Sequence, residues 1–255
     1  MLDPDPEDYE RHLAWVRQAD DQVLAVLDRL PDPAFAEPSL LPGWSRAHVA
    51  AHLAHNAEGL ARLATWAATG VETPMYPSAE ARAADIESTA AHRPADVREK
   101  VAAASTRLVL QLDDLPPAAR AVEVRGLLPP PFLAATIPWQ RVRELWVHLV
   151  DLDAGVGLAD LPADVQVALL DEAVERSLVR PVAHPVVLVE DAGAGAGGRW
   201  ALGPEDGATV LTGPRPLLLS WLTGRPAAAG EALGPDALAV TGPGAPDLPP
   251  RPAWP

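Results

Sequence analysis

Apolar residues recur at intervals of three and four along the chain up to Gly155, the spacing that places them on one face of a helix. Proline- and glycine-rich breaks interrupt this pattern and divide it into separate helices. Four long helices are predicted over residues 6–30, 45–69, 95–115 and 137–154, with a shorter one over residues 79–90. Four long amphipathic helices joined in this way are typical of a four-helix bundle, and the cores of such bundles commonly hold metal sites.

After Gly155 the apolar runs become shorter, and several have the β-branched composition of strands. The expected strands are 186–190, 199–202, 209–212 and 238–241, and the expected helices are 162–179 and 214–223. We therefore predict a mainly α chain of two domains: a four-helix bundle over residues 1–157 and a small α+β domain over residues 158–255. The second domain ends in a proline-rich tail over residues 243–255, which we expect to be poorly ordered or draped on the surface.

The overall charge and hydropathy limit the class of partner. Hydrophobic residues make up 48% of the chain, enough for a globular core, and the formal net charge is −15. Nucleic acids and anionic membranes bind basic surfaces, so neither is expected as a partner. No apolar run approaches the ~20 residues of a membrane span, and the acidic N-terminus lacks the apolar core of a signal peptide. A cytoplasmic protein is expected.

The chain contains no cysteine. This excludes disulfides, cysteine-bound zinc and a thiol nucleophile supplied by the protein itself. Any thiol chemistry would need a thiol brought in from outside.

Four of the seven histidines lie in two of the predicted long helices. His48, His52 and His55 are spaced by four and three residues, and Glu144 precedes His148 by four, so each set can share a helix face. Taken alone, the histidine set is better explained by surface or hydrogen-bonded core histidines, and Glu144 with His148 by a solvent-facing pair. Together, on two helices of one bundle, they predict a shared metal ion. Three protein ligands with an open fourth position would be typical of a catalytic rather than a structural zinc site.

Two further polar residues, Arg141 and Asp151, have the spacing that places them on the same face as Glu144 and His148. Asp151 could orient a histidine ligand through a hydrogen bond. The alternative, a solvated charge pair near a helix end, is the one we expect, and we expect Arg141 to be exposed for the same reason.

Three segments carry a resemblance to a known family. Residues 41–56 resemble the second-helix signature of the mycothiol-dependent maleylpyruvate isomerases, which belong to the DinB-like metal-binding superfamily. Residues 141–151 resemble the fourth-helix signature, and residues 209–225 are similar to a strand–helix segment of the C-terminal domain. The resemblance covers most of the chain in the right order.

This resemblance implies a zinc ion (Zn²⁺) held by His52, Glu144 and His148. His48 belongs to the signature without being a ligand, and His55 is not expected to be essential. The fourth zinc position would be open to water or to the sulfur of mycothiol.

The resemblance also implies an activity. Zinc would lower the pKa of the mycothiol thiol, and the thiolate would add to the C=C bond of maleylpyruvate. Rotation about the resulting single bond and elimination would give fumarylpyruvate, a step in the degradation of aromatic compounds. An arginine of the C-terminal domain would bind the anionic substrate, with Arg225 as the better match and Arg215 as its competitor.

Two alternatives share the same residues. A mycothiol S-transferase would keep the metal and the thiol but conjugate another electrophile, and a binding protein would hold a small molecule without turnover. A structural protein with incidental histidines is the simplest remaining alternative. A monomer is compatible with the sequence, which does not determine the oligomeric state.

Overall fold

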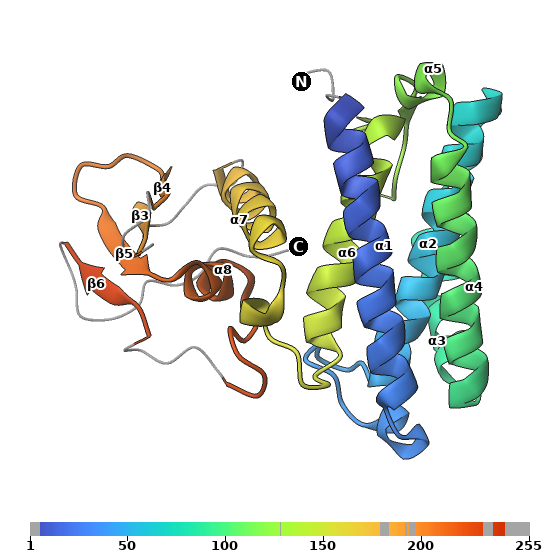
Figure 1. Ribbon diagram of the computed structural model, residues 1–255, viewed down its shortest axis with the longest axis horizontal. Coiled ribbons are helices and arrows are strands. Elements are labelled where there is room, and N and C mark those ends of the chain that lie inside the picture. Colours follow the sequence, from blue (N-terminus) through green and yellow to red (C-terminus); the bar gives the residue numbers. More distant parts are fainter. Residues whose placement is uncertain are drawn as a thin grey trace. The chain divides into compact units, whose positions relative to one another are not determined.

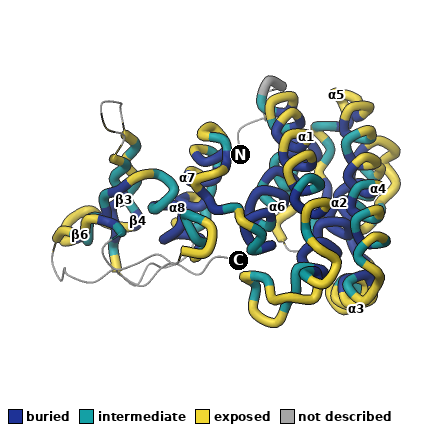
Figure 2. Tube along the Cα trace, turned by 60° about the horizontal axis from the view of Figure 1, so that its bottom comes forward, coloured by how far each residue is buried: buried dark blue, intermediate teal, exposed yellow. Residues whose placement is uncertain are grey.

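Four long helices form the N-terminal part of the molecule, as the apolar periodicity predicts (Figure 1). Their bounds are α1 Pro6–Arg29, α2 Arg46–Thr69, α4 Pro94–Asp113 and α6 Ile137–Asp151. In this computed structural model α2 packs against both α4 and α6, and α1 also packs against both. The four helices therefore enclose one core, and Figure 2 shows their buried faces turned towards one another.

The helix ends follow local backbone chemistry. Ser45 precedes α2 as its N-cap, and Gly70 ends that helix with a left-handed φ of 72°, as expected. The predicted extension of α6 to residue 154 is wrong, because the helix ends at Asp151. Asp153 and Gly155 have φ values of 51° and 90°, which a right-handed helix cannot contain.

A fifth helix, α3, covers Ala79–Ala90 as predicted and packs against α2. Ile86 and Thr89 are its buried residues. This packing places α3 beside the part of α2 that carries the histidines.

Several short elements connect the helices, and the sequence pattern did not reveal them. They are the helix α5 Pro117–Arg120, the paired strands β1 Glu123–Val124 and β2 Phe132–Leu133, and the 3-10 turns η1 Asp32–Ala36, η2 Ala134–Thr136 and η3 Leu158–Asp160. Elements of two to five residues are too short to show a hydrophobic period.

The chain divides into two compact units, Met1–Ala154 and Gly155–Pro255. The structure describes residues 6–127, 129–178, 184–191, 193, 197–231 and 237–242. The expected proline-rich tail over residues 243–255 and most of the glycine-rich run over residues 192–198 lie outside the described residues. The assignment of 1–157 and 158–255 as separate domains stays a prediction.

The second unit contains two helices and a mixed four-stranded sheet. The helices are α7 Ala163–Leu178 and α8 Arg215–Thr223, and the strands are β3 Val186–Glu190, β4 Arg199–Leu202, β5 Thr209–Gly213 and β6 Ala239–Thr241. The strand order is β4-β3-β5-β6, with β3 parallel to β5 and both edge strands antiparallel to their neighbours. Helix α8 packs against β3, β5 and α7. The predicted fold class, mainly α with a smaller α+β part, is confirmed.

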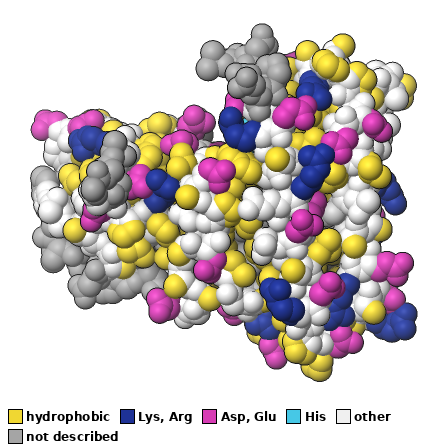
Figure 3. All heavy atoms as spheres, viewed as in Figure 1, with side chains coloured by type: hydrophobic (Ala, Val, Ile, Leu, Met, Phe, Trp, Pro, Cys, Tyr) yellow, Lys and Arg dark blue, Asp and Glu magenta, His cyan; other side chains and the backbone are white. Residues whose placement is uncertain are grey.

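Charged side chains of both signs are interspersed on the face shown in Figure 3. Among the described residues on that face, basic side chains stand among acidic ones and form no continuous basic patch. No helix within the described ranges is long and apolar enough to cross a membrane.

Candidate metal centre

Three side chains from two helices converge in the N-terminal unit. His52 on α2 places Nε2 2.9 Å from Glu144 Oε2 and 3.1 Å from His148 Nε2, and the last two atoms are 3.4 Å apart. One ligand atom from each residue lies within 4.8 Å of the other two. The structure therefore brings together the two segments that the sequence paired.

These spacings fit a small divalent cation. Bonds of about 2.0 to 2.1 Å from a tetrahedral zinc ion to nitrogen or oxygen would hold neighbouring ligand atoms about 3.3 Å apart. The observed distances of 2.9, 3.1 and 3.4 Å lie close to that value. Two imidazole nitrogens and one carboxylate oxygen are also a donor set that suits zinc among the common divalent metals.

The protonation states of two of the three residues also favour a cation. Burial opposes the charged form of Glu144, but the hydrogen bonds with His148 and His52 outweigh it and hold the pKa of that carboxyl well below its usual value. Burial lowers the pKa of His52 to about 4, despite the hydrogen bond with Glu144. Glu144 is therefore anionic and His52 neutral at neutral pH.

Asp151 sets the orientation of the third residue. Its Oδ2 lies 2.9 Å from His148 Nδ1, so that nitrogen donates and Nε2 keeps its lone pair for the cluster. Burial alone would lower the pKa of His148, but the hydrogen bonds with Asp151 and Glu144 raise it instead. The expectation that Asp151 is a solvated residue at a helix end is wrong, because its side chain is only 1% exposed.

The expectation of an exposed Arg141 is also wrong, since this side chain is fully buried. Its guanidinium donates to Leu53 O at 2.8 Å, to Asn56 Oδ1 at 3.0 Å and to Ser105 Oγ at 2.9 Å. It also contacts Asp20 Oδ1 at 3.3 Å. Arg141 thus joins α6 to α1, α2 and α4 in the core of the bundle.

The other two histidines of α2 lie outside the cluster. His48 contacts Ser45 Oγ through Nδ1 at 2.7 Å and Glu87 on α3 through Nε2 at 3.0 Å. His55 contacts Thr89 on α3 at 2.8 Å and Glu58 at 3.1 Å. Of the three candidates on α2, only His52 points towards Glu144 and His148.

Sequence reasoning missed two arginines that lie beside the cluster, Arg82 and Arg143. Arg82 on α3 places Nη2 2.9 Å from His52 Nδ1, and the ring of Trp44 lies 5.7 Å from the His52 ring. Arg143 Nη2 lies 3.6 Å from Glu144 Oε1. Arg82 carried no signal in the sequence, because it is an isolated arginine on a short helix whose packing partner could not be foreseen.

The two candidate arginines of the C-terminal unit differ in their surroundings. Arg215 Nη2 forms an ion pair with Glu190 Oε1 at 2.7 Å, and Glu190 is 9% exposed. Arg225 follows the glycine that ends α8, and its Nη1 donates to Thr223 O at 2.9 Å. Arg215 is thus held by a largely buried carboxylate of its own unit.

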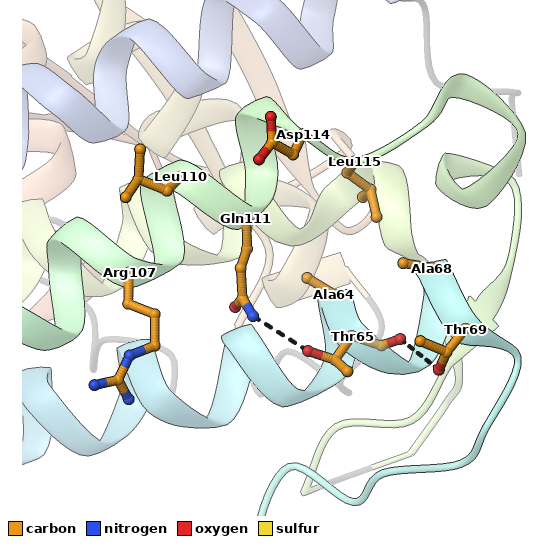
Figure 4. Close-up of a pocket in the computed structure, with 9 residues that line it drawn as sticks. All are labelled: Ala64, Thr65, Ala68, Thr69, Arg107, Leu110, Gln111, Asp114 and Leu115. Carbon is orange, nitrogen blue, oxygen red and sulfur yellow. Dashed lines mark hydrogen bonds between the residues drawn. The ribbon is translucent and has the colours of Figure 1, made fainter.

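A recess of about 300 Å³ lies elsewhere, between α2 and α4 (Figure 4). Gln111 donates to Thr65 Oγ1 across it at 3.3 Å, while Arg107 and Asp114 point away from each other. This recess contains none of the residues of the His52 cluster. It gathers no convergent ionisable groups, so the chemistry is better assigned to the cluster.

The chain is similar in sequence and in fold to several known proteins. Two uncharacterized proteins of Mycobacterium tuberculosis, from strains CDC 1551 / Oshkosh and H37Rv, are each 28% identical over 224 residues, which cover 84% of this chain and 82% of each relative. The crystal structure of the mycothiol-dependent maleylpyruvate isomerase superimposes with a TM-score of 0.84 at 28% identity, covering 96% of this chain and 97% of that one. The crystal structure of the H52A mutant of that isomerase gives the same values. Residues 16–153, more than half of the chain, match the family described as the mycothiol maleylpyruvate isomerase N-terminal domain. The chain therefore belongs to the mycothiol maleylpyruvate isomerase family.

Proposed function

We propose that this protein is a mycothiol-dependent isomerase that converts maleylpyruvate to fumarylpyruvate, with a zinc ion held by His52, Glu144 and His148. The observation that carries the proposal is the convergence of three ligand atoms within 4.8 Å. It gains weight from the near full-length similarity to the isomerase structure, at a TM-score of 0.84.

The residues of the cluster have separate roles in this proposal. Glu144 supplies the one negative charge among the ligands, and His52 and His148 supply neutral nitrogens. Asp151 holds the proton of His148 at Nδ1 and thereby directs Nε2 to the metal. A zinc ion bound there would lower the pKa of a thiol at its open position and supply a thiolate at neutral pH. The absence of cysteine agrees with a nucleophile that arrives as a cofactor.

Arg225 is proposed to bind a substrate carboxylate, as the family resemblance implies. The Arg215–Glu190 pair supports this choice, since recruiting Arg215 would leave a largely buried carboxylate without its cation. Replacing each arginine by glutamine separates the two. The Arg225 variant should raise KM for maleylpyruvate or lower kcat, whereas the Arg215 variant should lower stability. The opposite pattern would reverse the assignment.

The metal site is tested by measuring the zinc content of the purified protein and two matched variants. His52→Ala should lose bound zinc. His48→Ala, one turn earlier on α2 but paired with Ser45 and Glu87, should retain it. Full zinc occupancy in the His52→Ala variant would show that His52 is not a zinc ligand and would contradict the proposed site.

The reaction is tested by incubating the zinc-loaded protein with maleylpyruvate, with and without mycothiol. The expected result is fumarylpyruvate only when the thiol is present, with no net consumption of thiol. Accumulation of a stable thiol conjugate would instead identify an S-transferase. Saturable binding of substrate without any turnover would identify a binding protein.

A further inference from the structure

Arg82 and His52 make a contact that depends on the position of one proton. Arg82 Nη2 lies 2.9 Å from His52 Nδ1. A guanidinium can only donate hydrogen bonds, so Nδ1 must accept. The proton of the neutral ring therefore sits on Nε2, where it can donate to Glu144 Oε2 at 2.9 Å.

A metal ion on His52 reverses this arrangement. When Nε2 binds a metal, the ring proton moves to Nδ1, because a neutral imidazole carries only one. Two N–H donors, from His52 and from Arg82, then face each other. They need a common acceptor.

The other histidine of the cluster, His148, has an acceptor of the usual kind at its Nδ1. Its Nδ1 faces the Asp151 carboxylate at 2.9 Å, the arrangement that metal-bound histidines normally adopt. His52 Nδ1 faces Arg82 in that place, and within the described residues its hydrogen-bond partner is this cation. Within the described residues no acceptor is bonded to His52 Nδ1, so a bound ligand can supply one.

The charges around the cluster point to an anion. With a divalent ion bound, Arg82 and Arg143 add to its positive charge, and the carboxylates of Glu144 and Asp151 oppose it. Arg82 forms no ion pair with any carboxylate of the described residues. Its guanidinium lies 5.7 Å from the centre of the Tyr76 ring, a contact that holds it beside the cluster.

We propose that a carboxylate of the substrate binds between His52 and Arg82 and accepts hydrogen bonds from both. Arg82 is then a substrate-binding residue of the N-terminal unit that selects anionic over neutral ligands. The inference rests on the proposed function, because it takes the metal and an anionic substrate from there. It adds a recognition residue on α3 that is distinct from the arginine proposed in the C-terminal unit.

The test uses maleate, a stable dicarboxylate, titrated calorimetrically into the full-length protein. Zinc-loaded protein should bind maleate at least about tenfold more tightly than the Arg82→Gln variant, since a hydrogen bond to a charged group is lost. The maleate affinity of Arg82→Lys should lie between those of the unaltered protein and Arg82→Gln, because lysine keeps the charge but not the fork of donors.

Arg62→Gln is the matched control: this half-buried arginine on α2 donates to Met75 O and contacts no residue of the cluster. It should bind maleate like the unaltered protein.

A second measurement separates substrate binding from a purely structural role. If Arg82 only held the His52 ring in place, Arg82→Gln would weaken zinc binding in competition with a chelator. The proposal predicts zinc binding as tight as, or tighter than, that of the unaltered protein, because the contact with Arg82 favours the proton over the metal on Nε2. Weaker zinc binding, or maleate binding within twofold of the unaltered protein, would overturn the proposal.

The inference and the proposed function fail in different ways. If maleylpyruvate is not isomerised but maleate binding still depends on zinc and Arg82, the inference stands and the reaction is different. If isomerisation proceeds with the same KM in Arg82→Gln and maleate binding is unaltered, the inference fails and the reaction stands.

Discussion

Replacing Asp151 by asparagine should weaken zinc binding without unfolding the bundle. The Asp151 side chain is 1% exposed, and its Oδ2 lies 2.9 Å from His148 Nδ1. Removal of such a partner from a ligand histidine typically weakens metal binding 10- to 100-fold, or about 1.4 to 2.7 kcal/mol. Asparagine keeps an oxygen acceptor and loses only the charge, so its effect should lie near tenfold. Leucine leaves a buried N–H without an acceptor, and its effect should approach 100-fold.

Competition with a chromophoric chelator at a fixed pH measures these affinities directly. Asp153→Asn is the matched control, because this residue lies just beyond the same helix end with a side chain that is 41% exposed. It contacts Arg46 and none of the histidines of the cluster. Tryptophan fluorescence during urea unfolding checks that each variant is folded. Equal zinc affinities for the Asp151 and Asp153 variants, with both folded, would refute the assigned role of Asp151.

Three further predictions concern stability and are read from urea unfolding curves. Arg141→Met should destabilise the protein by about 3 to 5 kcal/mol, because Asp20 is left as a buried carboxylate without its cation. Adding Asp20→Leu should recover part of that loss. If the two changes in unfolding free energy were strictly additive, the pairing would be contradicted. Burial lowers the pKa of His12 to about 4, so as the pH falls from 6.5 to 4 the unfolded chain takes up a proton that the folded protein does not. The free energy of unfolding should therefore decrease as the pH is lowered through this window, and less steeply in His12→Gln. Gly70→Ala should lower the free energy of unfolding by about 1 kcal/mol, because an alanine is strained at the left-handed φ of 72°, although its Cβ would clash with no neighbour. An unchanged urea unfolding midpoint would contradict this prediction.

The helices could be predicted from the sequence because they depend on local spacing. Proline and glycine at their ends, with apolar residues every three or four positions, defined α2 and α3 to within a residue or two. The short hairpin β1–β2 and the helix α5 could not be predicted, since their formation depends on the bundle against which they lie. The parallel pairing of β3 with β5 is likewise a long-range contact that no local pattern indicates.

The candidate site was predicted in part. Spacing alone left His48, His52 and His55 as equal candidates, and only the family resemblance favoured His52. The structure supplies a physical reason for the difference. His48 contacts Glu87 and His55 contacts Thr89, both on α3 and more than 30 residues away in the sequence, so these two rings bond to α3 and not to Glu144 and His148.

The two environments that were predicted wrongly, those of Arg141 and Asp151, have one cause. A polar stripe on a helix is expected to face solvent, because burying charge without partners is expensive. On α6 the stripe faces the interior, where Arg141 meets acceptors from α1, α2 and α4 and Asp151 meets His148. The partners come from distant parts of the chain, so the helix by itself gives no sign of them.

This inward stripe explains how a bundle positions a metal site. Arg141 is bonded to three other helices and therefore fixes the rotation of α6 about its own axis. Glu144 and His148 follow three and seven residues later on the same face, so the rotation that buries Arg141 also directs them towards His52. A change at Arg141 that leaves the protein folded should therefore loosen the metal cluster as well as the core. Stability and metal geometry therefore depend on the same helix orientation, although Arg141 bonds to none of the three cluster residues and lies less than one turn from Glu144.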